Sequence, residues 1–242
     1  MFDLPRNVVF PADEVAIAVE PGPHPWEIGK ADAIAANWRA ETAANPYLFD
    51  GEVILLSRLV HEHRRISATC HPVRFSTFMH WRRCRPVAEA EHIFANAIPV
   101  SADNALVAIR MRAHTANAGK AYFSSGSFEP ADFRDGQVDI QANMIREVRE
   151  ETGLDLTGRR GEAGFHAFSE TSGTVIVRRF YLEETAKELA EKIRRFVAAQ
   201  SDPEIEGPVI IRGAADLPDR LAPHMRPLIE WHFSGQDASS RA

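Results

Sequence analysis

Three glutamates near the middle of the chain have the residue type and spacing for metal chemistry. Glu147, Glu150 and Glu151 are three and four residues apart, so on an α-helix their side chains lie on neighbouring points of one face. Gly153 is the predicted C-cap, which places these acids at the negative end of the helix dipole. Each like charge there destabilises a bare helix by roughly a few tenths of a kcal/mol, and a bound cation reverses that sign. Oxygen ligands alone favour Mg²⁺, or Mn²⁺, over zinc.

An acidic run can also be a solvated helix face, and the flanking residues bear on the choice. The same segment carries an apolar stripe of Ile140, Met144, Ile145 and Val148, centred about 90° from the acids by helical geometry. Asp139 is the predicted N-cap. We therefore expect a helix that packs one face on a core and exposes the neighbouring, acidic face to water.

Residues 126 to 154 resemble the signature of the Nudix hydrolases. The second half of that pattern is Arg-Glu-apolar-any-Glu-Glu-any-Gly-apolar, and every fixed position is matched, by Arg146, Glu147, Val148, Glu150, Glu151, Gly153 and Leu154. Gly126 takes the leading glycine of the first half, and Asp132 stands where the family has its first glutamate. Thirteen residues instead of seven separate Asp132 from Arg146. The extra six fall in the segment FRDGQVD, a polar turn that can lengthen without disturbing the helix.

The resemblance implies a Nudix αβα sandwich with a mixed sheet, in which water attacks a phosphorus atom of a nucleoside diphosphate linked to another moiety. It implies that Glu147, Glu150, Glu151 and Asp132 bind Mg²⁺ or Mn²⁺, with Glu150 and Glu151 also catalytic. It further implies that Arg146 orients a carboxylate through a salt bridge, for which Glu129 is a candidate, although a surface arginine is the alternative. Gly126 would supply the backbone turn beside the substrate.

The general base is less visible in the sequence. By the same resemblance it is either a helix glutamate or a glutamate of a later loop, for which Glu204 and Glu206 in the segment DPEIEG are the candidates. Acidic loops are more often simply solvated.

About ninety residues precede the part that resembles a Nudix domain. The segment Asn45 to Gly51 and the segment Arg74 to Trp81 are similar to the N-terminal region of Nudix proteins that hydrolyse UDP-glucose and UDP-galactose. This similarity implies UMP and a sugar 1-phosphate as products, with Phe49, Phe78 or Trp81 beside the ligand, although buried aromatics are more often core residues.

Arg110 and Arg112 share one face of a predicted strand and are candidates to pair with the phosphates. An exposed cationic face is the alternative interpretation. Two other functions also stay open: a Nudix pyrophosphatase acting on ADP-ribose, a dinucleotide or a coenzyme A ester, and a Nudix-fold nucleotide-binding module without catalysis.

The bulk composition limits the class of protein. With 242 residues, 45% hydrophobic and 26% charged, the chain forms one large or two small domains. The net charge of −6 argues against a general nucleic-acid binder. Two cysteines, Cys70 and Cys84, suggest a reducing compartment without disulfides. No membrane-length apolar run or signal-peptide pattern is found, so we expect a cytoplasmic protein without membrane contact, and a homodimer remains open. The clusters His63 to Arg65 and Arg82 to Arg85 read as solvated ends of elements.

Hydrophobic periodicity gives the order of elements. Strands are predicted at 6–20, 52–60, 66–72, 93–99, 104–112, 163–170, 174–182 and 208–212, and helices at 27–44, 75–84, 184–200 and 223–232 besides the acidic one. The predicted class is α/β (α+β), with a small α+β region at 1–88 that contributes to substrate binding and a Nudix domain at 89–242.

Overall fold

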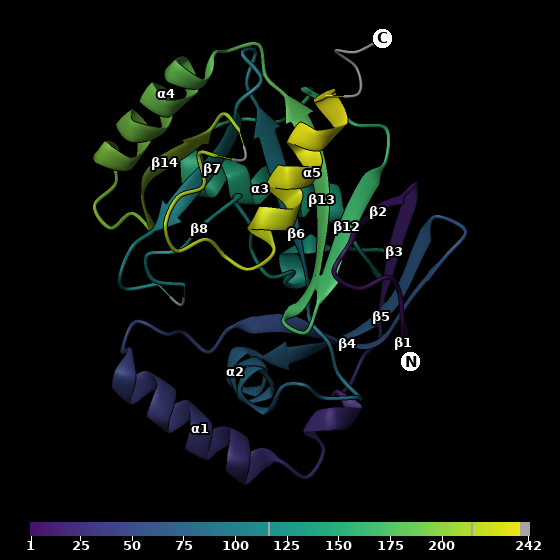
Figure 1. The fold of residues 1–242 in the computed structure, drawn as a ribbon. Helices are drawn as coiled ribbons and strands as arrows, with labels where there is room; N and C mark the ends of the chain where they lie inside the picture. Colours follow the sequence, from purple (N-terminus) through teal and green to yellow (C-terminus); the bar gives the residue numbers. More distant parts are fainter. Residues whose placement is uncertain (116, 214, 238–242) are drawn as a thin grey trace.

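The computed structural model describes residues 1–115, 117–213 and 215–237, which fold around two β-sheets (Figure 1). The first sheet has the strand order β1-β4-β5-β3-β10-β9. Its strands are β1 (Phe2–Asp3), β3 (Glu14–Val19), β4 (Glu52–Glu62), β5 (Arg65–Arg74), β9 (Phe133–Arg134) and β10 (Gln137–Val138). Beside it lie the short 3₁₀ helix η1 (Pro25–Glu27) and the helices α1 (Ala31–Ala44) and α2 (Phe75–Cys84).

The second sheet has the order β14-β7-β6-β13-β12-β2. Its strands are β2 (Val9–Ala12), β6 (Ile93–Val100), β7 (Leu106–Met111), β12 (Phe165–Glu170), β13 (Gly173–Tyr181) and β14 (Ile205–Ile211), with β8 (Ala121–Tyr122) on β7 and β11 (Arg160–Gly161) on β13. The central strands β6 and β13 pair in parallel, whereas the other strand pairs of this sheet are antiparallel. The sheet is therefore mixed, as predicted.

Helices cover both faces of this second sheet. The helices are α3 (Ile140–Thr152), α4 (Ala186–Ala199) and α5 (Met225–Asp237). In Figure 1, α5 passes in front of the sheet and α3 lies behind it, and the contacts of α3 are with β6 and α4. The predicted mixed α/β class is confirmed by this arrangement, and the predicted helices are found within a few residues of their expected ends.

The predicted strand at 6–20 is wrong, because the chain divides there into β2 and β3. The two strands belong to different sheets, β2 pairing with β12 and β3 with β5. They are separated by Asp13, whose backbone N–H donates to the carbonyl of Arg64 at 2.7 Å. Both strands have the alternating pattern that suggested one strand. The point at which the chain passes from one sheet to the other therefore could not be predicted from hydrophobic periodicity.

The six additional residues before the acidic helix form a hairpin instead of an open turn. Strands β9 and β10 pair with each other, and β10 continues the pairing onto β3 at Gln137 and Ala18. Asp135 and Gly136 form the two-residue turn with φ angles of 49° and 73°, as in the Asp-Gly turns that suit tight hairpins. The insertion thus attaches the start of α3 to the first sheet.

Strands are exchanged across the predicted boundary at residue 88. Strand β2 lies in the second sheet, and β9 and β10 lie in the first. One large hydrophobic core contains residues from both sides of the boundary, for example Ile54, Leu56, Ile93 and Met144. A smaller cluster under α2 contains Trp26, Leu55 and Trp81, among others. The predicted division into two domains remains a prediction.

Two further predictions from the sequence concern the state of the cysteines and membrane-spanning helices. Among the residues described, Cys70 is buried and Cys84 exposed, and both are free thiols. None of the helices in the described ranges combines the length and the apolar character needed to cross a membrane.

Candidate active site

Local sequence signals place the acidic helix where the prediction put it. The Asp139 carboxylate accepts a hydrogen bond from the backbone N–H of Ala142 at 2.9 Å and caps the first turn. The helix ends at Gly153 in the left-handed conformation, with φ of 72°. Met144 and Val148 are fully buried and fix α3 on the core. With its inner face so fixed, the helix turns its glutamates toward the edge of the second sheet.

Two of the three glutamates are buried together although they carry like charges. Glu147 and Glu151 are only 9% and 8% exposed, whereas Glu150 is exposed. Burial, and then the charges of Glu150 and other nearby carboxylates, raise the pKa of Glu147 to about 7 despite the opposing effect of Arg146. Burial, followed by the charges of Glu147 and Glu204, raises the pKa of Glu151 well above its usual range. Burial is therefore the main cause of both shifts.

Arg146 connects the helix acids to the loop before the helix. Its Nη1 atom lies 2.7 Å from Glu147, 3.1 Å from Glu150 and 3.4 Å from Glu129. Its Nη2 atom lies 3.0 Å from Asp132, and its Nε atom donates to the same carboxylate at 3.3 Å. The predicted pairing with Glu129 is present but long, and the two-pronged contact with Asp132 is the stronger one.

Asp132 has a different environment from the one expected of a metal ligand. Its side chain is only 2% exposed, and both oxygens accept hydrogen bonds from Arg146. One oxygen also accepts from the side-chain amide of Asn143 at 2.9 Å and from the backbone N–H of Glu129 at 3.1 Å. These donors occupy the lone pairs that a metal ion would need. In this structure the Asp132 carboxylate holds Arg146, and its predicted role as a metal ligand stays a prediction.

The three helix glutamates share a cavity with a glutamate from a distant loop. The cavity has a volume of about 590 Å³. It is lined by Glu147, Glu150, Glu151, Ala199, Gln200, Ser201, Asp202 and Glu204. Glu204 thus comes from the loop between α4 and β14, as one of the two candidates for the base. Glu206, the other candidate, is exposed in β14 and does not line the cavity.

The turn at Gly126 lies against the same carboxylates. The backbone N–H of Ser125 donates to Glu151 Oε2 at 3.2 Å. A Cβ atom at position 126 would stand 2.1 Å from Glu147 Oε1, closer than any van der Waals contact permits. The close approach of Glu147 thus explains why a glycine stands here, and the turn packs against two of the carboxylates that line the acidic cavity.

The donor set suits a hard divalent cation. Oxygen atoms of glutamates line the cavity, and two of these carboxylates bury like charges that a cation would neutralise. Within the described ranges, however, no three acidic, histidine or cysteine side chains stand in position to hold a metal ion. Arg146 draws Glu147 and Glu150 to itself, while Ser125 holds Glu151. Binding would therefore require these side chains to exchange partners.

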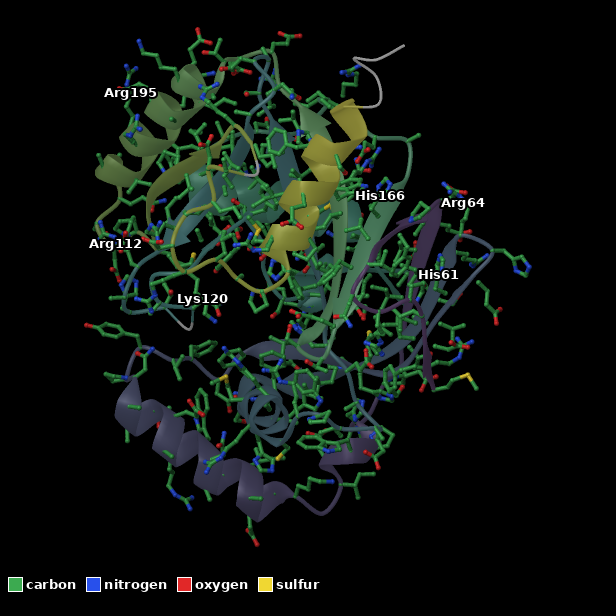
Figure 2. All side chains as sticks on the ribbon, in the orientation of Figure 1. His61, Arg64, Arg112, Lys120, His166 and Arg195 are labelled. Atoms are coloured by element: carbon green, nitrogen blue, oxygen red, sulfur yellow. The ribbon has the colours of Figure 1, made fainter. Side chains whose placement is uncertain are left out.

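The other predicted substrate-binding residues lie outside this cavity. Arg110 donates to the carbonyls of Gly119 and Asp219, at 3.1 and 3.4 Å, and Arg112 donates to the carbonyl of Ile205 at 3.3 Å. Neither arginine lines the acidic cavity, although the backbone N–H of Arg112 donates to the carbonyl of Glu204 at 2.9 Å. In Figure 2 Arg112 lies near the lower end of α4.

The three aromatic candidates differ in exposure, although the rings of Phe78 and Trp81 contact each other with centroids 5.6 Å apart. Phe49 is 81% exposed, and Trp81 is 2% exposed with its indole N–H donating to the carbonyl of Ala90 at 3.0 Å. Phe78 lines a second cavity on the other side of the Ser125 to Gly126 turn. Trp81 and Phe78 both belong to the smaller core cluster, and Phe78, 8% exposed, also lines this second cavity.

Sequence reasoning missed several residues of this second cavity. Arg82 and Arg85 line it, although their cluster reads as a solvated helix end, and Lys120, His92 and His224 join them from other elements. A helix-end cluster with two arginines three residues apart was the available signal. The cluster at 63 to 65 fits its prediction better, since Arg64 is exposed and pairs with Asp13.

Comparison with known sequences gives no assignment. No protein-family model matches the chain, and no curated protein matches it.

Three solved structures resemble the fold weakly. A MutT protein from Methanosarcina mazei is 18% identical, with 60% of this chain and 94% of that chain covered and a TM-score of 0.36. A Nudix hydrolase from Nitrosomonas europaea is 16% identical, with 62% and 90% covered and a TM-score of 0.37. An Ap4A hydrolase from C. elegans is 10% identical, with 61% and 98% covered and a TM-score of 0.37. With TM-scores below 0.5, these likenesses assign neither a family nor an activity to this chain.

Proposed function

We propose that the protein is a Mg²⁺-dependent Nudix hydrolase that cleaves the pyrophosphate of a nucleotide sugar. The observation that carries the proposal is the acidic cavity, in which the three signature glutamates meet Glu204. The signature residues alone would allow a solvated helix face. Burial of Glu147 and Glu151 against the Gly126 turn argues against that alternative, because buried like charges require a compensating ligand.

Glu147, Glu150 and Glu151 would hold Mg²⁺, and Mn²⁺ has the same ligand preference. The bound ion would neutralise the two phosphates, which otherwise repel an anionic nucleophile. The residues of the chain supply the remaining functions. Arg146, anchored on Asp132, restrains the carboxylates of Glu147 and Glu150.

Glu204 is our candidate for the general base. It is exposed within the cavity and comes from a loop, so its carboxylate can reach water beside the glutamate cluster. In the proposed reaction a carboxylate oxygen of Glu204 takes the proton of the attacking water. The new P–O bond forms as the bridging P–O bond breaks, which gives a nucleoside monophosphate and a sugar 1-phosphate.

The sugar nucleotide is the narrower part of the proposal. It is supported by the similarity of the segments 45 to 51 and 74 to 81 to the N-terminal region of UDP-glucose and UDP-galactose hydrolases. The second segment reaches the cavity beside Gly126 through Phe75 and Phe78. This lining supports our proposal that the N-terminal region contributes to substrate recognition.

Product analysis tests both levels of the proposal. The protein is incubated with UDP-glucose, ADP-ribose or coenzyme A in Mg²⁺, and the products are separated by anion-exchange chromatography. We expect UMP and glucose 1-phosphate from UDP-glucose. Cleavage of ADP-ribose or coenzyme A alone would refute the nucleotide-sugar assignment and retain the hydrolase.

Substitutions of two glutamates and addition of a chelator test the mechanism. Glu151→Gln is expected to lower turnover by several orders of magnitude while circular dichroism shows an intact fold, and a chelator is expected to abolish turnover. Glu204→Gln should lower turnover at least about 100-fold if Glu204 is the base, whereas the matched control Glu206→Gln should not. Turnover that survives chelation would refute the metal mechanism, and no turnover of any substrate would leave a binding module.

A further inference from the structure

A second cavity opens on the far side of the Ser125 to Gly126 turn from the glutamates. Its volume is about 340 Å³, and its lining combines α2, β6, the loop before β8 and the start of α5. Ser125 and Gly126 belong to its wall, while Ser125 also donates to Glu151. The two cavities are therefore adjacent, linked by the hydrogen bond from Ser125 in the wall of one to Glu151 in the lining of the other.

One wall of this cavity is a continuous series of aromatic rings. Phe75 stacks on Phe78 with ring centroids 5.6 Å apart, and Phe78 contacts His92 at 4.7 Å. His92 stacks on Phe94 at 5.3 Å, and Phe94 meets His224 edge-on at 5.2 Å. The rings are inclined to one another, by 60° between Phe78 and His92, and a cavity lined by ring faces and edges favours a planar aromatic ligand, such as a nucleobase, over a sugar or a flexible chain.

The cavity is also positively charged. Arg82, Arg85 and Lys120 line it, and its lining contains no carboxylate among the described residues. None of the three makes an ion pair with a described residue. Burial, followed by the charges of Arg82, Arg220 and Arg85, lowers the pKa of Lys120. Figure 2 shows Lys120 at the boundary between the second sheet and the layer of α1 and α2.

Two imidazole nitrogens in the cavity have no partner among the described residues. Nε2 of His92 and Nε2 of His224 are buried without a hydrogen bond. Each residue is only 9% exposed, and both line the cavity. An unsatisfied buried polar atom costs about 1–3 kcal/mol, so a ligand whose polar edges reach these two nitrogens would remove that cost.

We propose that this aromatic and cationic cavity binds the nucleoside monophosphate half of the substrate. The base packs against Phe78 and Phe94 and hydrogen-bonds to the imidazole nitrogens of His92 and His224. Arg82, Arg85 and Lys120 hold the phosphate attached to the nucleoside. The scissile phosphorus then lies at the Ser125 to Gly126 turn, and the remaining moiety extends into the acidic cavity.

This inference rests on the proposed function for its account of the scissile bond, but its binding test needs neither metal nor turnover. UMP, AMP and ribose 5-phosphate are titrated into the full chain in EDTA by isothermal calorimetry. Ribose 5-phosphate carries the same phosphate without a base. We expect UMP or AMP to bind with a dissociation constant below about 1 mM, and ribose 5-phosphate to bind at least tenfold more weakly.

Matched variants locate the site. Lys120→Ala and Arg82→Ala should each weaken nucleotide binding at least tenfold. Arg83→Ala is the control, because Arg83 follows Arg82 on α2 but is exposed and donates to Asn37 at 3.2 Å. Phe78→Leu should weaken UMP or AMP and leave ribose 5-phosphate unchanged. Circular dichroism of each variant establishes that the fold is retained.

The outcomes separate this inference from the proposed function. Three results would each overturn the assignment of the cavity. They are failure of both nucleotides to bind at 5 mM (roughly the weakest affinity worth detecting), equal binding of ribose 5-phosphate, and unchanged nucleotide binding by Lys120→Ala and Arg82→Ala. Mg²⁺-dependent hydrolysis could still stand in those cases. Conversely, nucleotide binding that depends on these residues without hydrolysis in Mg²⁺ would uphold the inference and refute the proposed function.

Discussion

Replacing Arg146 tests whether the arginine is the electrostatic centre of the candidate site. Its side chain is 22% exposed, and carboxylates of Asp132, Glu147, Glu150 and Glu129 lie within 3.4 Å of it. Burial works against its charged form, but Asp132 and Glu147 outweigh that effect and raise its pKa. Arg146→Met keeps most of the side-chain volume and removes the charge.

The expected loss of stability follows mainly from the buried partner. Removing one member of a buried ion pair costs about 3–5 kcal/mol. Asp132, at 2% exposed, would retain its hydrogen bonds from Asn143 and Glu129, which favours the lower end, about 3 kcal/mol. For a chain of this size each kcal/mol lowers Tm by about 2–4 °C. We therefore expect Tm to fall by about 6–12 °C in the absence of divalent cations.

A double-mutant cycle isolates the contact between Arg146 and Asp132. Urea unfolding is measured for Arg146→Met, Asp132→Asn and the double variant, and the coupling energy is expected to be about 1–3 kcal/mol. Arg149→Met is the matched control on the same helix, since Arg149 is exposed and such changes stay within about 0.5 kcal/mol. A loss below about 1 kcal/mol in Arg146→Met, or a coupling energy near zero, would refute the assignment of Asp132 as the anchor.

Three other substitutions or conditions give direct tests. Gly126→Ala places a Cβ 2.1 Å from Glu147 Oε1, and because that carboxylate can swing away, we expect an intact fold with Mg²⁺ affinity at least about tenfold weaker by calorimetry; unchanged affinity would contradict the close approach. Burial lowers the pKa of His92 to about 3 and that of His224 to about 4. As the pH falls, these histidines therefore take up protons in the unfolded state before they do so in the folded state. Each should lower the free energy of unfolding by about 2 kcal/mol between pH 7 and pH 5. Urea unfolding at both pH values checks this, and a His224→Gln variant with the same pH dependence as the parent would be evidence against it. Gly153→Ala, at a φ of 72° and with a Cβ 2.4 Å from the Phe196 ring, should cost at least about 1 kcal/mol in the same assay.

Signals that span a few residues predicted the elements well. The stripe of Met144 and Val148, the cap at Asp139 and the stop at Gly153 define α3 locally, and the structure places its ends at Ile140 and Thr152. The same reasoning identified α2 at 75–84 with the bounds found. Helix and strand periods depend on neighbours within one or two turns, so a sequence carries them without knowledge of the rest of the fold.

Residues that act through distant partners were harder to predict. The Asp-Gly pair at 135 and 136 signals a tight hairpin, yet its pairing with β3 depends on a strand more than a hundred residues away. The role of Asp132 followed from its distance to Arg146 and Asn143, not from its position in the motif. Arg82 and Arg85 resemble any solvated helix end until Lys120 and the aromatic rings are placed beside them.

The sequence by itself determined the acidic helix, the spacing of its glutamates and the mixed α/β class, because each depends on short-range periodicity and capping. Only the tertiary structure decided that β2 and β3 join different sheets, that Asp132 holds Arg146, and that Glu204 shares the cavity of Glu147, Glu150 and Glu151. Those outcomes depend on burial and charge contacts between segments far apart in the chain, which local patterns do not encode.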